Sequence, residues 1–254
     1  MQEFKGTMLN PNPRIFIVGG WWKEPQHLVD DWYESFSWAD KICIVDDRKN
    51  KVWGDEGKYR LKQRAKLEKA GIKPWDWVFV TSPDERLEVG AEAVMREEIQ
   101  KDLGLRTYSF DLKELFTPLQ YRTDGIWGRK TRPRLYPYLP NQIFHTRKIQ
   151  QTPVPLTRIN QRYKRLKLDL NIYHLKMIEP ENRQTRIDDY TAADPQGRLV
   201  NKNSPSIKRL DPEGKFAKHG WNYLKDTEGM ILERIPRGRG YRPKYKPYSL
   251  RKIS

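Results

Sequence analysis

The chain has 254 residues, enough for one sizeable α/β domain with an appendage, and combines a low hydrophobic content of 37% with 32% charged residues. One cysteine excludes an internal disulfide framework, and without a signal peptide or an apolar run of about 18 residues we expect a cytoplasmic protein with no membrane span (host cytoplasm if viral). Residues 1–118 hold 19 Lys and Arg against 21 Asp and Glu, so the net charge of +16 belongs to residues 119–254, which predicts a polyanionic partner or, alternatively, a merely soluble basic surface.

The first 104 residues alternate short apolar runs with helical patterns. Strands are predicted at 14–18, 42–46 and 77–81, and helices at 28–36, 59–70 and 84–102. Three strands that alternate with helices imply right-handed crossovers. The fold class is therefore α/β, with a mostly parallel sheet flanked by helices.

The pattern changes after Phe116. We expect loops and short antiparallel strands such as 134–138, a later strand at 171–175, a helix at 180–190, a polar loop at 194–218 and a basic tail at 235–254 that wraps the body or stays mobile. The expected division is an α/β half (1–118), a second part of the same domain (119–193) and an irregular basic C-terminal extension (194–254).

Carboxylates follow two of the predicted strands. Asp46 and Asp47 come at the end of the second strand, and Asp84 and Glu85 follow the third. Because ligands of open α/β sheets bind at the carboxyl ends of the strands, these acids are placed to hold a sugar, a ribose or a metal-bound phosphate. The alternative is that each is a turn or helix-capping residue.

Several common motifs are absent from the sequence. Gly19-Gly20 follows the first strand without the rest of a dinucleotide-binding fingerprint, and neither a P-loop nor a nucleophile elbow occurs. One cysteine and four scattered histidines form no zinc cluster of the usual spacing.

Short segments carry a family resemblance. Lys23-Glu24-Pro25 before an amphipathic helix, and Ile42-Cys43-Ile44-Val45-Asp46-Asp47 after it, resemble the start of family 2 glycosyltransferases of the GT-A fold, whose second strand ends Val-Asp-Asp-Gly-Ser. The run at 77–87 resembles that family's strand ending Asp-Ala-Asp-Glu. Three further runs are similar to segments of small phage and bacterial members, at 121–128, 134–136 and 174–183.

The resemblance implies a GT-A-like, Rossmann-like fold and a donor site for a nucleotide sugar of the UDP or GDP type in residues 1–118. Asp46 and Asp47 would bind the nucleobase or the ribose, and Glu24 would line the same pocket. Arg48 stands where the family usually has glycine after its two aspartates.

The resemblance also implies a divalent cation, Mg²⁺ or Mn²⁺, on the donor diphosphate. Asp84 would be the second acid of the Asp-x-Asp pair that holds it, but Ser82 replaces the first acid. His174 would be a metal or phosphate ligand, and Lys176 a cation near the diphosphate. If the cation is weakly held or absent, basic residues would replace its charge.

Family 2 members are inverting, which implies a single displacement assisted by a carboxylate base. No Asp or Glu occurs between Asp124 and Asp169, so Asp124 is the first candidate, with Asp169 and Glu179 behind it. The alternative for Asp124 is a turn residue before Gly125.

The function expected from these observations is transfer of a sugar to a hydroxyl of a macromolecular acceptor. The basic half and the interleaved aromatic and basic residues of 127–163 favour a polyanion, and hydroxymethylated phage DNA is our specific candidate. Two alternatives stay open: an acceptor that is a virion or cell-surface protein or glycan, and a non-catalytic nucleic-acid-binding protein on a degenerate GT-A fold.

Overall fold

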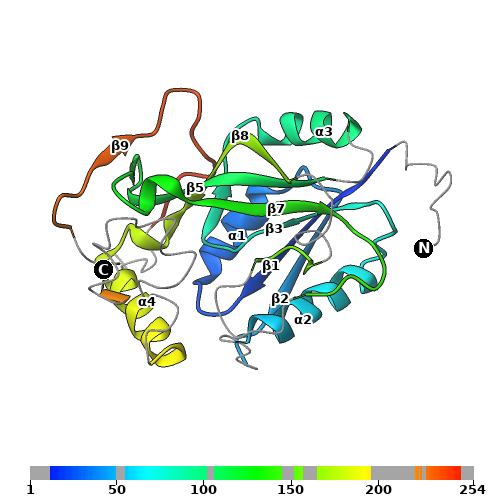
Figure 1. Cartoon of the computed structure of the whole chain (residues 1–254), viewed down its shortest axis with the longest axis horizontal. Coiled ribbons are helices and arrows are strands. Elements are labelled where there is room, and N and C mark those ends of the chain that lie inside the picture. Colours follow the sequence, from blue (N-terminus) through cyan, green and yellow to red (C-terminus); the bar gives the residue numbers. More distant parts are fainter. Residues whose placement is uncertain are drawn as a thin grey trace.

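A computed structural model describes residues 12–49, 55–101, 106–144, 152–156, 165–195, 221–222, 224 and 227–246. The strands are β1 (Ile15–Trp21), β2 (Lys41–Asp46), β3 (Trp77–Val80), β4 (Glu85–Leu87), β5 (Thr107–Thr117), β6 (Gln120–Arg122), β7 (Thr131–Pro137), β8 (Arg165–His174) and β9 (Leu232–Arg234) (Figure 1). The α-helices are α1 (Gln26–Ser35), α2 (Glu56–Lys69), α3 (Ala91–Lys101) and α4 (Pro180–Ala193).

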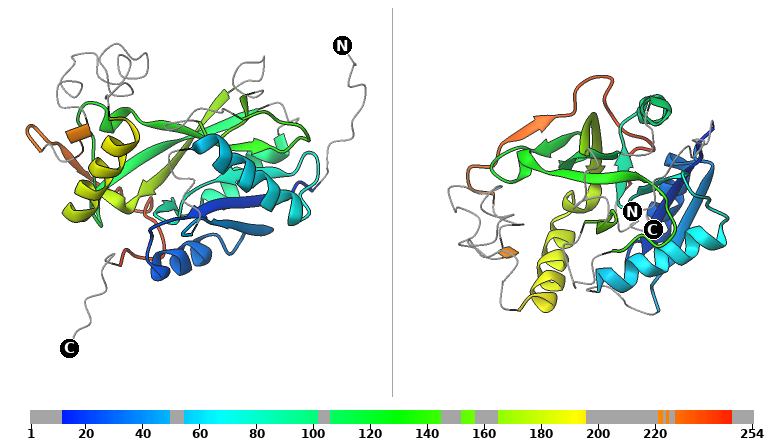
Figure 2. Two further views of the ribbon diagram at one scale, coloured as in Figure 1. Left: turned by 90° about the horizontal axis from the view of Figure 1, so that it is seen from below. Right: turned by 45° about the vertical axis from the view of Figure 1, so that its right-hand side comes forward.

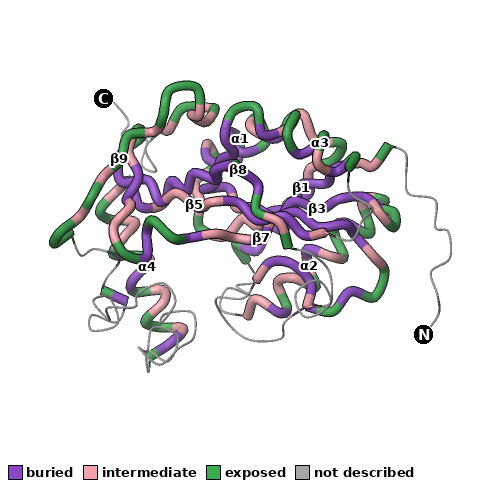
Figure 3. Tube along the Cα trace, turned by 45° about the horizontal axis from the view of Figure 1, so that its top comes forward, coloured by how far each residue is buried: buried purple, intermediate pink, exposed green. Residues whose placement is uncertain are grey.

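The central sheet packs between helices, which confirms the α/β class. Alternate residues of β1 point to opposite faces of the sheet because successive side chains of a strand alternate. Ile15 and Ile17 pack with residues of α1 and α3, whereas Phe16 and Val18 pack with Leu67 of α2. The central strands are accordingly buried on both faces, and α2 and α3 lie on opposite sides of them (Figures 2 and 3).

The expected parallel arrangement holds for the first three strands and for β5 with β8. β1 lies between β2 and β3 and is parallel to both, so their carboxyl ends share one edge of the sheet. Beyond β3 the order continues through β7, β5, β6 and β9, with β8 beside β5 and β4 beside β8. Because β7 is inserted between β3 and β5 and runs antiparallel to both, the sheet is mixed and not mostly parallel.

Two predicted elements differ in the structure. The helix expected from residue 84 begins only at Ala91, because residues 85–87 form β4 against β8, and Gly90 turns the chain with a φ of +87°. The later strand begins at Arg165 instead of residue 171. β5 was not predicted, although its buried Tyr108 and Phe110 show the two-residue alternation of a strand.

The described part of the C-terminal tail wraps the body. β9 pairs with β6, and Arg239 forms ion pairs with Glu88 and Asp169. Lys246 reaches the buried Asp31 of α1 at 2.8 Å. Most of the polar loop predicted at 194–218 lies outside the described residues. No helix in the described ranges is long and apolar enough to cross a membrane.

Candidate functional site

The carboxyl edge of the parallel strands gathers charged side chains from distant parts of the chain. Glu24 lies in the turn between β1 and α1, and Asp84 lies in the turn between β3 and β4. Lys176 lies in a short 3₁₀ turn directly after β8. The charges of Asp84 and Lys176 both act on Glu24, which places the three groups within electrostatic reach of one another. Three of the predicted site residues therefore come together.

A buried chain of ion pairs lies behind this edge. His174, the last residue of β8, has its Nε2 3.2 Å from Oδ2 of Asp84 and its Nδ1 2.7 Å from Oε2 of Glu114 on β5. Burial favours the neutral imidazole, but the charges of Glu114 and Asp84 outweigh it and raise the pKa of His174 to about 9. In turn the imidazolium keeps the pKa of Asp84 and of Glu114 below the usual range, against their burial.

Further cations surround these carboxylates. Nζ of Lys130 lies 2.9 Å from Oε1 of Glu114, and a guanidinium nitrogen of Arg186 lies 3.4 Å from Oε2. Burial lowers the pKa of Lys130 to about 8 despite the attraction of Glu114. Lys176 also acts on Asp84, yet among the described residues it forms no ion pair. The edge therefore carries an available positive charge.

Glu24 is held by its own turn. Its Oε2 accepts hydrogen bonds from the backbone N–H groups of Trp22 and Lys23, at 2.9 and 3.2 Å. Burial raises the pKa of Glu24, and the negative charge of Asp84 raises it further. Tyr59 of α2 packs closely against the same stretch: a Cβ on Gly20 would lie 1.0 Å from its hydroxyl oxygen. Glycine at that position is thus required for the contact.

The two aspartates at the end of β2 have different roles. Asp46 is half exposed and forms an ion pair of 2.6 Å with Arg48, whose hydrogen bonds lower the pKa of Asp46 to about 2. The Arg48 guanidinium also lies 3.4 Å above the ring of Trp21. Asp47 is buried and bound by Lys62 of α2 at 2.9 Å. Asp46 is therefore accessible to a ligand, whereas Asp47 anchors a helix.

The predicted general bases Asp124, Asp169 and Glu179 each bind partners outside the His174 cluster. Glu179 accepts hydrogen bonds from the hydroxyl of Tyr245 at 2.7 Å and from the side-chain amide of Asn182 at 3.2 Å. Arg122 is buried and donates to both carboxylate oxygens of Asp124, at 2.7 and 2.8 Å, and the Ile231 N–H donates to Oδ1 as well. Asp169 has a side chain 92% exposed and pairs with Arg239, and it lies roughly 16 Å from His174 along β8. Asp124 thus connects a turn to the C-terminal segment, and Asp169 is a surface partner of Arg239. The role of general base stays a prediction for all three carboxylates.

The predicted cation ligands do not fit a divalent metal as they are placed. Both ring nitrogens of His174 face carboxylates, so neither offers a lone pair to a cation shared with Asp84. Glu85, the next acid in sequence, binds Arg134 and accepts from the Ser82 N–H. In the described ranges no three His, Cys, Asp or Glu side chains are grouped to hold a metal ion.

Three members of the cluster were not predicted. Glu114 lies on β5, a strand that the sequence did not reveal, while Lys130 and Arg186 were only part of a general excess of positive charge. One signal was available: Glu114 follows Phe110 and Leu112 at two-residue spacing, which on a strand places it on the same face as these apolar residues, and a buried acid needs a cation nearby.

His174 predicts a specific pH dependence of stability. Its pKa is about 9 in the folded protein against 6.5 when unfolded, so the folded state binds more protons between these values. The stabilisation that His174 contributes is complete below pH 6.5 and is lost as the pH rises through 9. The pKa of Lys130 is shifted in the opposite direction, to about 8, so Lys130 changes the pH dependence of stability only above pH 8. Urea unfolding should therefore show stability falling between pH 6.5 and 8, by at most about 1.4 kcal/mol per pH unit. An equal slope in His174→Gln would contradict this assignment.

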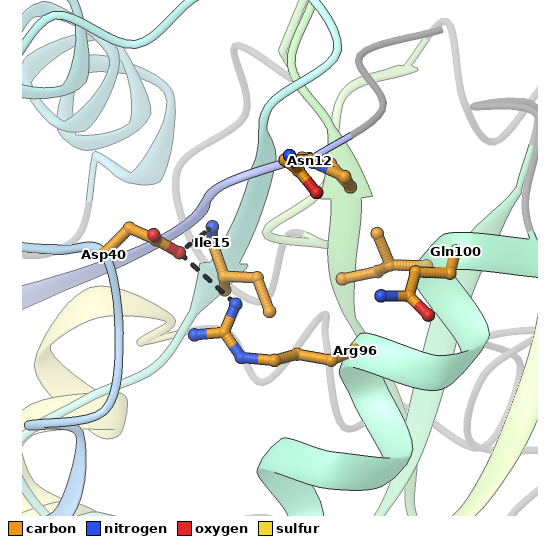
Figure 4. A pocket seen from close by; sticks show the side chains of 7 residues that line it. Asn12, Ile15, Asp40, Arg96 and Gln100 are labelled. Atoms are coloured by element: carbon orange, nitrogen blue, oxygen red, sulfur yellow. Dashed lines mark hydrogen bonds and ion pairs between the residues drawn. The ribbon is translucent and has the colours of Figure 1, made fainter.

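A separate small cavity lies at the opposite end of β1. It has a volume of about 150 Å³, and the polar side chains Asn12, Asp40, Arg96 and Gln100 line it together with Ile15 (Figure 4). Asp40 already accepts from the Ile15 N–H at 2.8 Å and pairs with Arg96 at 3.5 Å. Since its charges are paired and it lies away from the carboxyl edge, this cavity is not the candidate site.

No protein-family model matches the chain, and no curated protein matches it. The resemblance to family 2 glycosyltransferases therefore rests on the short segments that carry it. Function is inferred from the geometry of the carboxyl edge.

Proposed function

We propose that the protein is a glycosyltransferase with a GT-A-type fold, which takes a nucleotide sugar as donor and transfers the sugar to a hydroxyl of a macromolecular acceptor. One observation carries the proposal: Glu24, Asp84 and Lys176 follow the carboxyl ends of β1, β3 and β8, and their charges act on one another there. That edge is the ligand-binding position of open α/β sheets. His174, which precedes Lys176 by two residues, binds Asp84 there.

Electrostatics favours an anionic ligand at this edge. The carboxylates of Asp84 and Glu114 form ion pairs with three cations: His174, Lys130 and Arg186. The positive charge of Lys176 comes in addition to these and can bind an anionic ligand. A diphosphate fits this requirement. As the bond to the sugar breaks, negative charge grows on the departing nucleoside diphosphate, and a fixed ammonium nearby stabilises it.

The nucleoside end of the donor fits the end of β2. The ring of Trp21 is fixed by a hydrogen bond of 2.7 Å from its Nε1 to the carbonyl of Glu24, and Arg48 stacks over it. The half-exposed carboxylate of Asp46 lies beside this pair and accepts hydrogen bonds. Aromatic and guanidinium faces bind nucleobases by stacking, and an exposed carboxylate binds ribose hydroxyls or base N–H groups.

Exposed cations of the C-terminal segment support a polyanionic acceptor. Arg234, Arg237, Arg242 and Lys244 are exposed along it. Hydroxymethylated phage DNA supplies both the negative charge and an acceptor hydroxyl. A protein or glycan acceptor is the competing possibility, and a non-catalytic nucleic-acid-binding protein is the second function; the latter predicts tight DNA binding with a steep salt dependence and no turnover.

The direct test is a screen of nucleotide sugars for release of nucleoside diphosphate, with and without acceptor. Hydroxymethylated DNA, unmodified DNA and glycan-bearing surfaces would serve as acceptors, and mass spectrometry would read the addition of one sugar. We expect at least one donor to be turned over. Absence of turnover for all donors, combined with salt-sensitive DNA binding, would replace the enzyme with the binding protein.

Lys176→Met gives a prediction about donor affinity. Removing the ammonium next to Asp84 should weaken binding of the nucleoside diphosphate about tenfold or more, since a charge-assisted contact to phosphate is lost. Isothermal titration would measure it. The matched control is Lys167→Met, a lysine of β8 that pairs with Asp111 away from the edge. Equal losses in the two variants would contradict a specific role for Lys176.

A further inference from the structure

Two buried or half-buried arginines lie on the α2 side of the sheet. Arg60 is half-buried on α2, and Arg134 lies on β7 with a side chain only 11% exposed. Tyr136, two residues further along β7, packs in the core cluster that includes Leu67 of α2, so Arg134 points to the same face. Burial lowers the pKa of Arg60 and the positive charge of Arg134 lowers it further, whereas the hydroxyl of Tyr136 raises it. The two guanidinium groups are therefore within electrostatic range of each other.

Their positive charges are incompletely matched. Arg134 binds the carboxylate of Glu85, but Arg60 has no ion pair among the described residues and donates only to the neutral Oε1 of Gln63, at 2.6 Å. The Nε atoms of Arg60 and Arg134 and the Nε2 of Gln63 are all buried without a hydrogen-bond partner. Buried polar groups are normally satisfied, so unsatisfied donors on α2 and on β7, within electrostatic range of one another, point to a ligand that supplies acceptors.

The chemistry of that ligand follows from the donors. Guanidinium groups match the geometry of phosphate and carboxylate oxygens and bind them through paired hydrogen bonds. Tyr59 connects these arginines with the candidate donor site. Burial raises the pKa of the Tyr59 hydroxyl, the positive charge of Arg60 lowers it, and the negative charges of Glu24 and Asp47 raise it further. A phosphate bound between the arginines would thus lie next to a donor held at the carboxyl edge.

We propose that Arg60 and Arg134 form a phosphate-binding subsite, with Gln63 as an additional donor. The phosphate has two possible sources, the diphosphate of the donor or a phosphodiester of a polyanionic acceptor. The first source rests on the proposed function, whereas phosphate binding itself does not. In the free protein some hydrogen-bond donors of the two arginines lack acceptors. Such a loss of stability is typical of groups that are retained for function.

The test uses Arg60→Gln, with Arg64→Gln as the matched control one turn further along α2. Arg64 carries the same charge but is paired with Glu68 at 2.7 Å. Titration calorimetry with inorganic pyrophosphate should show binding weakened at least about tenfold in Arg60→Gln and unchanged in Arg64→Gln. Because Arg60 is unsatisfied in the free protein, the melting temperature of Arg60→Gln should be unchanged or higher. Unaltered pyrophosphate affinity, or a lowered melting temperature, would overturn the proposal.

Two further ligands separate the subsite from the proposed function. If UDP or GDP binds, and if the wild type and Arg60→Gln bind the nucleoside diphosphate, pyrophosphate and the oligonucleotide equally, the subsite is wrong while the donor site stands. If pyrophosphate or a single-stranded oligonucleotide binds in an Arg60-dependent way and no nucleoside diphosphate binds, the subsite stands and the glycosyltransferase proposal fails. If Arg60→Gln weakens binding of the nucleoside diphosphate but not of the oligonucleotide, the phosphate belongs to the donor. If it weakens binding of the oligonucleotide but not of the nucleoside diphosphate, the phosphate belongs to the acceptor.

Discussion

Asp84→Asn is expected to reduce donor turnover at least about a hundredfold and to destabilise the fold by about 3 kcal/mol. The carboxylate is buried and faces the imidazolium of His174, so the neutral amide leaves a buried positive charge incompletely compensated. Urea unfolding and release of nucleoside diphosphate would measure the two effects.

A control for this variant is Asp111→Asn, which removes a carboxylate from a more exposed ion pair with Lys167. It should leave both stability and turnover close to wild type. An Asp84→Asn protein with wild-type stability would contradict the buried ion pair. Wild-type turnover in the same variant would contradict a role for Asp84 at the donor.

Glu114→Gln is expected to cost about 3–5 kcal/mol of unfolding free energy, the largest stability effect in the protein. This carboxylate is fully buried and receives three cations: Lys130, His174 and Arg186. The variant should also lower the pKa of His174, since one of its two carboxylate partners loses its charge. Denaturant unfolding and NMR titration of the imidazole would test both statements.

The double variant Glu114→Gln, Lys130→Met provides the control. Lys130→Met removes one of the cations that Glu114→Gln leaves unpaired, so the double variant should be more stable than Glu114→Gln alone. Simple additivity of two losses would show that Lys130 and Glu114 do not interact as the 2.9 Å contact requires.

The first three strands were predictable because they are short apolar runs, and β1 and β3 are buried on both faces. Runs such as Trp77–Val80 are continuously apolar and hence visible in sequence. β5 escaped prediction because it mixes buried aromatics with Asp111 and Glu114, whose cations come from residues far along the chain. Charged residues inside a strand can be interpreted only when their partners are known.

The same limitation applies to the partners of the candidate bases. Asp124 was predicted as the general base because no other acid occurs in the basic region that follows it. Arg122, only two residues away, donates hydrogen bonds to both of its carboxylate oxygens. That pairing is local and was available from the sequence. The partner of Asp169 was not, because Arg239 comes from the C-terminal segment and reaches β8 only through the tertiary fold.

The structure also refines the interpretation of the charge asymmetry. Several basic residues of the second half bind acids of the first half: Lys130 and Arg186 bind Glu114, Arg134 binds Glu85, Arg239 binds Glu88, and Lys246 binds Asp31. Part of the net charge of residues 119–254 therefore holds the fold together. The exposed cations of the C-terminal segment are the better evidence for a polyanionic partner.

Thermal unfolding with nucleoside diphosphates tests the central claim most directly. A ligand that binds only the folded state at a hundred times its dissociation constant stabilises by about 2.7 kcal/mol. Because cations of the chain itself lie at the carboxyl edge, binding of the diphosphate should not need a metal ion. We therefore predict that UDP or GDP raises the melting temperature in buffer containing EDTA, and that Lys176→Met reduces this rise. If no nucleoside diphosphate changes the melting temperature, with EDTA or with Mn²⁺, the carboxyl edge is not a donor site.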